Sequence, residues 1–285
     1  MRALSAEGDL SIRAIVGTSL VAEAARRHRT APTATAALGR ALMGAILLAS
    51  GSSPEERVQL EFRGDGPLGG LTAIADGSAR ARGYVSRPGT HPPPREGKLD
   101  VARAVGSGLL GVVRSHPSRR EPYRGVVPLT SGEIAEDLAR YLDRSEQTAS
   151  AVGLGVYVAA DGSVEAAGGF LVQALPGASK TSLERLERNV REAPSPTGML
   201  RSGLDADGLV DTLFHGVGTR GRHSTQPRFY CGCGRDRVLR ALTLLGRSEV
   251  REAAATGETL EVRCEFCGES YSVEPDEVGA LLPDA

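Results

Sequence analysis

The four cysteines of this chain all lie in its last 55 residues, and their spacing indicates metal chemistry. Cys231 and Cys233 are separated by one glycine, and Cys264 and Cys267 are separated by two residues. Thirty residues lie between the two pairs. Four thiolates brought together form the tetrahedral sulfur set that zinc favours. Without metal, the same four thiols can form two disulfides, so the pattern also predicts a redox-sensitive site.

Each cysteine pair has a backbone geometry that can aim both sulfurs at one ion. In Cys-x-x-Cys a tight turn does this, and in Cys-x-Cys an extended segment places side chains i and i+2 on one face. The surrounding segment contains few apolar residues. One bound Zn²⁺ would therefore supply much of its stability, on the order of 10 kcal/mol or more. Because whole domains are stable by only roughly 5–15 kcal/mol, loss of the metal should unfold the segment.

Two other interpretations of these cysteines are weaker. From residue 227 onward there are seven arginines and eleven acidic residues, a net charge of −4. A nucleic-acid-binding zinc ribbon should instead be basic. A thioredoxin-like Cys-x-x-Cys belongs at the start of a helix after a strand, whereas Gly268 follows Cys267 and the local pattern is strand–turn–strand.

The composition is that of an ordinary globular protein. The chain has 285 residues, with 40% hydrophobic and 24% charged residues and a net charge of −1. This balance argues against a protein that coats nucleic acid or acidic membranes. No export signal precedes residue 28, and the longest apolar stretch, Ala41 to Ser50, is about half the length needed to cross a bilayer. We expect a cytoplasmic protein, where thiols are kept reduced.

The first 176 residues predict an α+β domain with a mixed or antiparallel β-sheet and packed helices. Apolar alternation predicts strands, separated by Gly, Asp and Pro turns, at 9–16, 57–63, 69–75, 80–85, 109–115, 123–128, 150–159 and 164–174. Helices are predicted at 18–28, at 33–50, which should be buried, and at 132–146, where Thr130 and Glu133 suggest a capping box. The proline-rich stretch 86–97 is expected to be an exposed loop.

Residues 177–226 differ from the first domain and predict a marginally stable helical linker. A helix dense in Arg and Glu carries a sparse apolar stripe of Leu183, Leu186 and Val190. After several Pro and Gly residues, a short helix near 205–214 has Leu209 and Phe214 to bury. Helices of this length are not stable alone in water, so they must dock on another part of the protein.

The third part, 227–285, is expected to be a small zinc-binding domain. Arg235 to Leu245 predicts a helix, followed by a second short helix at 248–254 and a strand at 258–263 that leads into the Cys264 turn.

No enzyme is predicted. The run from Gly64 to Gly70 lacks the Gly-Lys-Ser/Thr ending of a phosphate loop and fits a turn between strands. Ser115 and His116 precede Pro117 and fit turn chemistry better than catalysis. The histidines show no metal-binding spacing; they are His28, His91, His116, His215 and His223.

Taken together, the motifs resemble the bacterial redox-regulated holdase chaperones, the 33-kilodalton heat-shock protein family. The Cys-x-Cys and Cys-x-x-Cys pairs near the C-terminus match that family's signature. The first domain resembles the family in the stretches from Gly64 to Gly70, Gly132 to Leu138, Ser145 to Gln147 and Ala167 to Pro176.

The resemblance implies an ATP-independent chaperone that holds unfolding proteins during oxidative stress. It implies a reduced, inactive form with one zinc on Cys231, Cys233, Cys264 and Cys267. By the same analogy, Cys264 pairs with Cys267 first and Cys231 with Cys233 afterwards, with zinc release and unfolding of the linker. It also implies a homodimer in the oxidised form, unfolded client proteins as partners, and neither nucleic acid nor membrane.

Two other functions remain open from the residues alone. In an adaptor or regulatory protein, zinc would be only a structural clip and would resist mild oxidation. A thiol–disulfide oxidoreductase would instead turn over catalytically.

Overall fold

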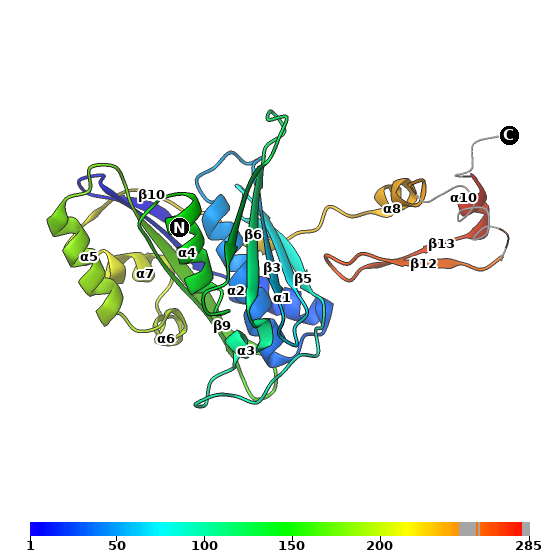
Figure 1. Ribbon diagram of the computed structural model, residues 1–285, viewed down its shortest axis with the longest axis horizontal. Helices are drawn as coiled ribbons and strands as arrows, with labels where there is room; N and C mark the ends of the chain where they lie inside the picture. The colour runs from blue at the N-terminus through cyan, green and yellow to red at the C-terminus, as the bar shows by residue number, and fades with distance from the viewer. Residues whose placement is uncertain (245–254, 256, 281–285) are drawn as a thin grey trace. The chain divides into compact units, whose positions relative to one another are not determined.

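The computed structural model describes residues 1–244, 255 and 257–280, and the chain divides into two compact units, Met1–Tyr230 and Cys231–Ala285 (Figure 1). Each unit has its own hydrophobic core. The division falls between Tyr230 and Cys231, so the four cysteines all belong to the second unit.

The first unit contains a five-stranded antiparallel sheet with the order β10-β1-β2-β9-β8. Its strands are β1 (Arg2–Ser5), β2 (Leu10–Val16), β8 (Ser150–Val158), β9 (Val164–Ala174) and β10 (Thr219–His223). Strands β1 and β10 pair with each other at one edge of this sheet, and they come from opposite ends of the unit's sequence. Strands far apart in the chain therefore form one edge of this sheet.

A second sheet of six strands has the order β11-β5-β4-β3-β6-β7. Its strands are β3 (Arg57–Gly64), β4 (Leu71–Asp76), β5 (Arg80–Val85), β6 (Gly108–Ser115), β7 (Tyr123–Pro128) and β11 (Arg228–Phe229). All neighbours are antiparallel except β11 and β5, which run parallel. The predicted mixed or antiparallel sheet domain is confirmed.

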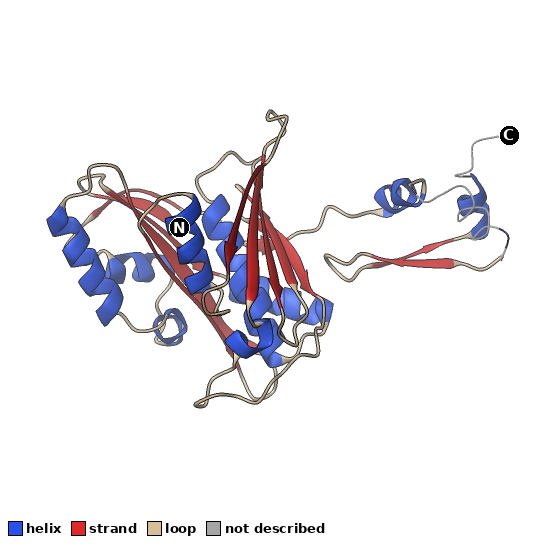
Figure 2. Cartoon of the chain, in the orientation of Figure 1, coloured by secondary structure: helices blue, strands red, loops and turns tan. Residues whose placement is uncertain are grey.

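Helix α2 (Pro32–Ala49) forms the centre of the first unit, between the two sheets (Figure 2). All but two of its residues are buried, and its core also contains side chains of β3, β6 and β9. Pro32 suits the first turn of a helix because that position needs no N–H donor. Helices α1 (Thr18–His28) and α3 (Val101–Val105) lie beside α2. The expected buried helix is confirmed.

The start of α4 (Ala135–Ser145) differs from the prediction. Its first turn is capped by Asp137, whose buried carboxylate accepts hydrogen bonds from the backbone N–H groups of Thr130 (2.7 Å), Ser131 (3.1 Å) and Ile134 (3.1 Å). Glu133 instead forms an ion pair with Arg40 at 2.5 Å. The predicted capping box of Thr130 and Glu133 is therefore wrong. Positive φ angles at Gly132 (75°) and Ile134 (67°) turn the backbone toward Asp137, so the helix begins three residues later than predicted.

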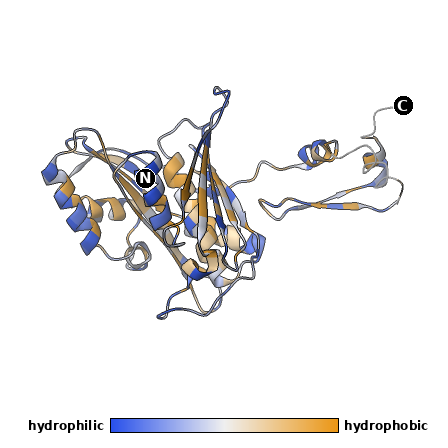
Figure 3. Ribbon diagram, in the orientation of Figure 1, coloured by the Kyte–Doolittle hydropathy of each residue, from blue (hydrophilic) through white to orange (hydrophobic). Residues whose placement is uncertain are grey.

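Three helices follow β9 and cover the face of the five-stranded sheet opposite α2: α5 (Lys180–Glu192), α6 (Pro196–Arg201) and α7 (Ala206–Leu213). Ser179, Ser195 and Asp205 cap their first turns through side-chain oxygens. In Figure 3, α5 alternates between hydrophilic and hydrophobic residues, as a helix with one buried face should. Residues of the predicted linker that share a core with β1, β2 and β9 are Leu186, Met199, Leu209, Val210, Leu213 and Phe214.

The sequence predicts that the linker helices dock on another part of the protein, and these contacts identify that part. Their apolar side chains pack on the sheet of the first unit, with Ile12, Phe170 and Val172. The short helices are stabilised by this sheet because it buries their apolar faces.

In the part of the second unit that the structure describes, a hairpin and the short helices α8 and α10 surround a small core. Its elements are α8 (Arg235–Leu242), β12 (Leu260–Arg263), β13 (Ser270–Val273) and α10 (Pro275–Ala280). Strands β12 and β13 are antiparallel and flank the Cys264 turn, as predicted. The core consists mainly of Val238, Leu242, Val273 and Val278. Helix α8 ends at Leu242 rather than Leu245, and the predicted helix at 248–254 lies outside the described residues.

Most predicted elements are present within one or two residues of their expected bounds, and 86–97 contains no regular helix or strand. The elements that were not predicted are β1, α3, α6, β10, β11 and α10. Helix α2 is long and apolar enough to cross a membrane, but 89% of it is buried within the protein. Its composition is thus that of a core helix.

Candidate metal and redox centre

The four cysteine sulfurs converge on one point in the second unit. The Sγ atoms of Cys231, Cys233, Cys264 and Cys267 all lie within 4.8 Å of one another. Cys267 is buried, and the other three side chains are partly buried. Among the residues that the structure describes, this is the one group of three or more His, Cys, Asp or Glu side chains found close enough to hold a metal ion.

The Cys264–Cys267 pair is positioned by a tight turn between β12 and β13. The backbone N–H groups of Cys267 and Gly268 both donate to the carbonyl of Cys264, at 3.4 and 2.8 Å. The N–H of Cys264 donates to the carbonyl of Glu269 at 2.8 Å. Gly268 has a φ of 72°, a conformation that favours glycine. The turn closes a hairpin and does not open a helix, so a thioredoxin-like arrangement is excluded here.

The other pair lies just before α8, where Gly234 precedes the first helical residue with extended backbone. Arg235 attaches this helix start to the hairpin. Its guanidinium donates to the carbonyl of Ser272 at 2.8 Å and pairs with Glu277 at 2.5 Å. These contacts join α8, β13 and α10 two residues from Cys233, so they help to hold Cys231 and Cys233 beside the hairpin turn.

The spacing of the sulfurs fits zinc. A tetrahedral Zn²⁺ with four Zn–S bonds of about 2.3 Å requires sulfur–sulfur distances of about 3.8 Å. The Cys231 and Cys264 sulfurs lie 3.8 Å apart, and those of Cys233 and Cys267 lie 3.3 Å apart. The donor set is also of the right kind, because four thiolates favour zinc over the hard cations that prefer oxygen.

The surroundings shift the thiol pKa values of Cys231, Cys233 and Cys267 in different directions. Burial raises the pKa of Cys231 to about 11 and also raises the pKa of Cys267. Burial acts in the same direction at Cys233, but hydrogen bonds from Tyr271 and from the neighbouring thiols outweigh it and lower the pKa of Cys233. The Tyr271 hydroxyl donates to the Cys233 sulfur at 3.2 Å. Of these three thiols, Cys233 is therefore the one whose ionisation the protein surroundings favour.

Sequence reasoning missed Tyr271 and Arg235 as supports of this centre. The available signal was the strand alternation after Cys267, which places Tyr271 and the fully buried Val273 on the same inward side of β13. An aromatic hydroxyl at that inward position, four residues beyond a metal-binding turn, is within reach of the sulfurs.

The histidines take no part in this centre. The ring of His91 hydrogen-bonds with Thr33 at 2.8 Å. His116 hydrogen-bonds with Ser118 at 2.6 Å in the turn after β6, which agrees with the predicted structural role. The run from Gly64 to Gly70 connects the antiparallel strands β3 and β4, as expected for a turn.

Comparison with known proteins gives consistent matches over almost the whole chain. The family model described as Hsp33 protein matches residues 1–274. The chain belongs to the Hsp33 family. It is 45% identical to a 33 kDa chaperonin of Thermus thermophilus, in an alignment covering all of this chain and 86% of that protein. It is 42% identical to the 33 kDa chaperonin of Geobacter sulfurreducens, over 99% of this chain and 93% of that one.

A solved structure also matches the Hsp33 fold of this chain. The crystal structure of the 33 kDa chaperonin (heat shock protein 33 homolog) from Thermotoga maritima aligns with a TM-score of 0.90 at 34% identity, covering 98% of this chain and 96% of that one. The α+β fold and the family resemblance expected from the sequence are both confirmed.

Proposed function

We propose that this chain is a redox-regulated, ATP-independent holdase chaperone, active when its four cysteines are oxidised. The observation that carries the proposal is the convergence of all four sulfurs within 4.8 Å. Membership of the Hsp33 family, whose curated relatives are named chaperonins, supports the same activity. Cys231, Cys233, Cys264 and Cys267 are the proposed ligands of one Zn²⁺ in the reduced form.

Oxidation of two thiols would remove half of the proposed ligand set. When bound, zinc would keep the sulfurs as thiolates, the form that reacts with oxidants. A cysteine thiolate attacks hydrogen peroxide to give a sulfenic acid and hydroxide, and a second thiol then displaces water to form a disulfide. Two remaining thiolates are too few for a closed tetrahedral site. Because folding of such a small unit is coupled to metal binding, its structure should be lost.

The choice of disulfide partner decides whether oxidation opens the second unit. We propose the pairs Cys264–Cys267 and Cys231–Cys233, which join residues within one short segment. The close sulfur contacts across segments, Cys231 to Cys264 and Cys233 to Cys267, also allow the alternative pairing. A bond between residues 33 positions apart would favour the folded state by about 4 kcal/mol through loop closure. The local pairs close much smaller loops, so they leave the hairpin and the 231–233 segment free to separate.

The proposed consequence is release of the linker, residues 177–226. Its helices bury apolar side chains on the five-stranded sheet, among them Leu186, Leu209 and Phe214. Release would expose these side chains together with the sheet face that they cover. A new apolar surface of this kind can bind unfolding proteins. We propose that unfolded clients bind there, that the oxidised form is a homodimer, and that the protein works in the cytoplasm without nucleic acid or membrane partners.

The test compares the reduced, zinc-loaded protein with protein treated with hydrogen peroxide at about 40 °C. Light scattering from a thermally unfolding client is followed while a chromophoric chelator records zinc loss, and peptide mapping identifies the disulfides. We expect suppression of aggregation only after oxidation, with zinc loss and local disulfides, and reversal by dithiothreitol. Retained zinc, or equal suppression by both forms, would identify the cysteines as a structural clip.

A further inference from the structure

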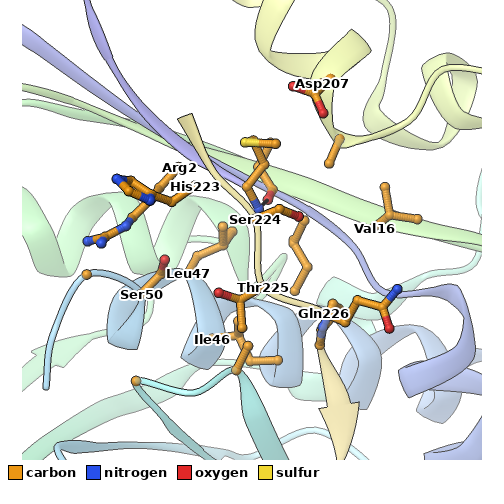
Figure 4. Close-up of a pocket in the computed structure, with 18 of the residues that line it drawn as sticks. Arg2, Val16, Ile46, Leu47, Ser50, Asp207, His223, Ser224, Thr225 and Gln226 are labelled. Atoms are coloured by element: carbon orange, nitrogen blue, oxygen red, sulfur yellow. Dashed lines mark hydrogen bonds between the residues drawn. The ribbon is translucent and has the colours of Figure 1, made fainter. Parts of the chain in front are cut away.

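A cavity of about 710 Å³ lies in the first unit, and its lining includes none of the cysteines. It is lined mainly by β1, β2, the C-terminal end of α2, the start of α7 and residues 224–227, here called the strap (Figure 4). The strap follows β10 in one sheet and precedes β11 in the other. This volume is within the range of small-molecule sites in proteins.

The lining of the cavity combines an apolar floor with polar groups. Ile46 and Leu47 of α2 contribute apolar side chains, and Figure 4 shows Thr225 and Gln226 of the strap beside them. Ser50 adds a hydroxyl at the end of α2. A floor of this kind suits the organic part of a ligand, and the few polar groups can orient it.

A row of basic side chains crosses the sheet at one end of this cavity. His223, Arg2 and Arg13 lie directly opposite one another on β10, β1 and β2, so they share one face. In Figure 4 the side chains of Arg2 and His223 lie next to each other. The guanidinium groups of both arginines approach Gly51: a Cβ placed there would lie 3.5 Å from Arg2 Nη1 and 3.8 Å from Arg13 Nη2.

This row has no carboxylate of its own. Within the described residues, no ion pair joins Arg2 or Arg13 to an acidic side chain, and Arg13 donates instead to the carbonyl of Leu47 at 3.1 Å. Burial, together with the charges of Arg114 and Arg2, lowers the pKa of Arg13 to about 10 even though Glu146 acts in the opposite direction. Like charges placed opposite each other in a sheet are destabilising.

The acidic groups nearby already have partners. Glu146 is bound by Arg114 at 2.8 Å. At the far side of the cavity, Asp207 pairs with Arg222 at 2.8 Å, and Asp205 accepts a hydrogen bond from the N–H of Gly208 at 2.9 Å. An anion from solution is therefore the partner that would offset the charge of the row.

We propose that this cavity binds a small phosphate-bearing organic anion, with the phosphate at Arg2 and Arg13 and the organic part on Ile46 and Leu47. Guanidinium groups bind phosphate through paired N–H donors, which suits the two arginines that meet at Gly51. The hydroxyls of Ser50 and Thr225, which also line the cavity, provide further donors.

Such a ligand would also clamp the linker in its docked position. The bound anion would contact β1 and α2 on one side and the strap and the start of α7 on the other. A ligand that binds only the docked form lowers the ratio of released to docked linker by a factor of 1 + [L]/Kd, about 100-fold at a ligand concentration of 100 Kd. Repression of chaperone activity by this ligand rests on the proposed function, whereas binding and clamping do not.

Binding is tested by calorimetry on the full-length, reduced, zinc-loaded protein at constant ionic strength. The probes are phenyl phosphate and inorganic phosphate. We expect phenyl phosphate to bind more tightly, and Arg2→Gln to weaken it at least 10-fold. The matched control, Arg220→Gln on β10, removes the same charge outside the lining and should change the affinity less than 2-fold. No binding of phenyl phosphate, equal binding of both probes, or equal losses in both variants would overturn the proposal.

Two further readouts separate a ligand site from a structural role. Without ligand, Arg2→Gln should unfold at the same temperature as the wild type or higher, because it relieves repulsion with Arg13. A lower unfolding temperature would identify Arg2 as a structural residue. Saturating phenyl phosphate should slow proteolysis between residues 200 and 226 in the wild type but not in Arg2→Gln. Binding without this protection would overturn the clamp, whatever the outcome of the chaperone assay.

Discussion

Leu209→Ala should release the linker without any change at the cysteines. Leu209 lies in α7, is fully buried, and belongs to the core shared with Ile12 and Phe170. Truncation of a buried leucine to alanine costs 2–5 kcal/mol because a cavity remains. With a cost of about 3 kcal/mol, the equilibrium constant for linker release should rise roughly 150-fold, at 1.4 kcal/mol per factor of ten.

Native-state hydrogen exchange measures this release in the reduced, zinc-loaded protein. The matched control is Leu42→Ala, the same change at a fully buried residue of α2 in the other core cluster. Leu209→Ala destabilises the docked state relative to every open state, so it should accelerate exchange both in α5–α7 and in β9. Leu42→Ala should accelerate hydrogen exchange in β9, because the amides of β9 exchange through unfolding of the whole unit. The exchange rates of α5–α7 should stay nearly unchanged.

The contrast between these two variants can refute the reasoning. If Leu42→Ala accelerates α5–α7 as much as β9, the linker and the sheet open as one cooperative unit. In that case the linker cannot be released separately, and the proposed switch would need unfolding of the entire first unit. Zinc affinity should equal that of the wild type in both variants, because neither residue lies in the second unit.

Four further predictions follow from the geometry. Asp137→Ala leaves the buried N–H groups of Thr130, Ser131 and Ile134 without their acceptor, so it should cost about 3 kcal/mol and lower Tm by about 10 °C in calorimetry. Burial raises the pKa values of Cys231 and Cys267, so these thiols are protonated near pH 7 without metal and must lose protons to bind zinc. Zinc affinity should therefore rise with pH between 6 and 8. Calorimetric titration with zinc in buffers of different ionisation enthalpy should detect the released protons. Tyr271→Phe removes the hydrogen bond to Cys233, which should raise the pKa of that thiol and slow its alkylation by iodoacetamide in the reduced, metal-free protein; an unchanged rate would assign Tyr271 a packing role. A flexible six-residue insertion between Tyr230 and Cys231 should leave oxidation and zinc loss intact but reduce the protease sensitivity of the linker after oxidation.

The cysteine centre was predictable from sequence because its geometry is local. Each pair is aimed by its own turn or extended segment, and the strand alternation around Cys264 and Cys267 indicates a hairpin. The support from Tyr271 and Arg235 was less predictable, because it depends on how β13 and α8 pack together. That packing is a tertiary property and leaves only a weak periodic signal in the sequence.

Contacts between distant parts of the chain account for the features that sequence reasoning missed. Strand β1 pairs with β10, more than 200 residues away, and both strands are short, with one arginine in β1 and two in β10. Neither has the apolar alternation that marks a strand. The prediction of the α4 cap was wrong for a different reason. The motif of Thr130 and Glu133 is present in the sequence, but positive φ angles at Gly132 and Ile134 direct the backbone N–H groups to Asp137.

The proposed switch also needs a path from the cysteines to the linker, and the polypeptide chain itself provides one. Strand β11 is held on β5 by backbone hydrogen bonds from Arg228 to Ala79 (3.0 Å) and from Tyr230 to Ala81 (2.8 Å). The next residue is Cys231. A two-residue strand has little stability of its own, so loss of structure at Cys231 can fray it easily. Fraying that starts at Cys231 would release the strap first and β10 next. Strand β11 is therefore the element most suited to transmit the structural effect of cysteine oxidation to the linker.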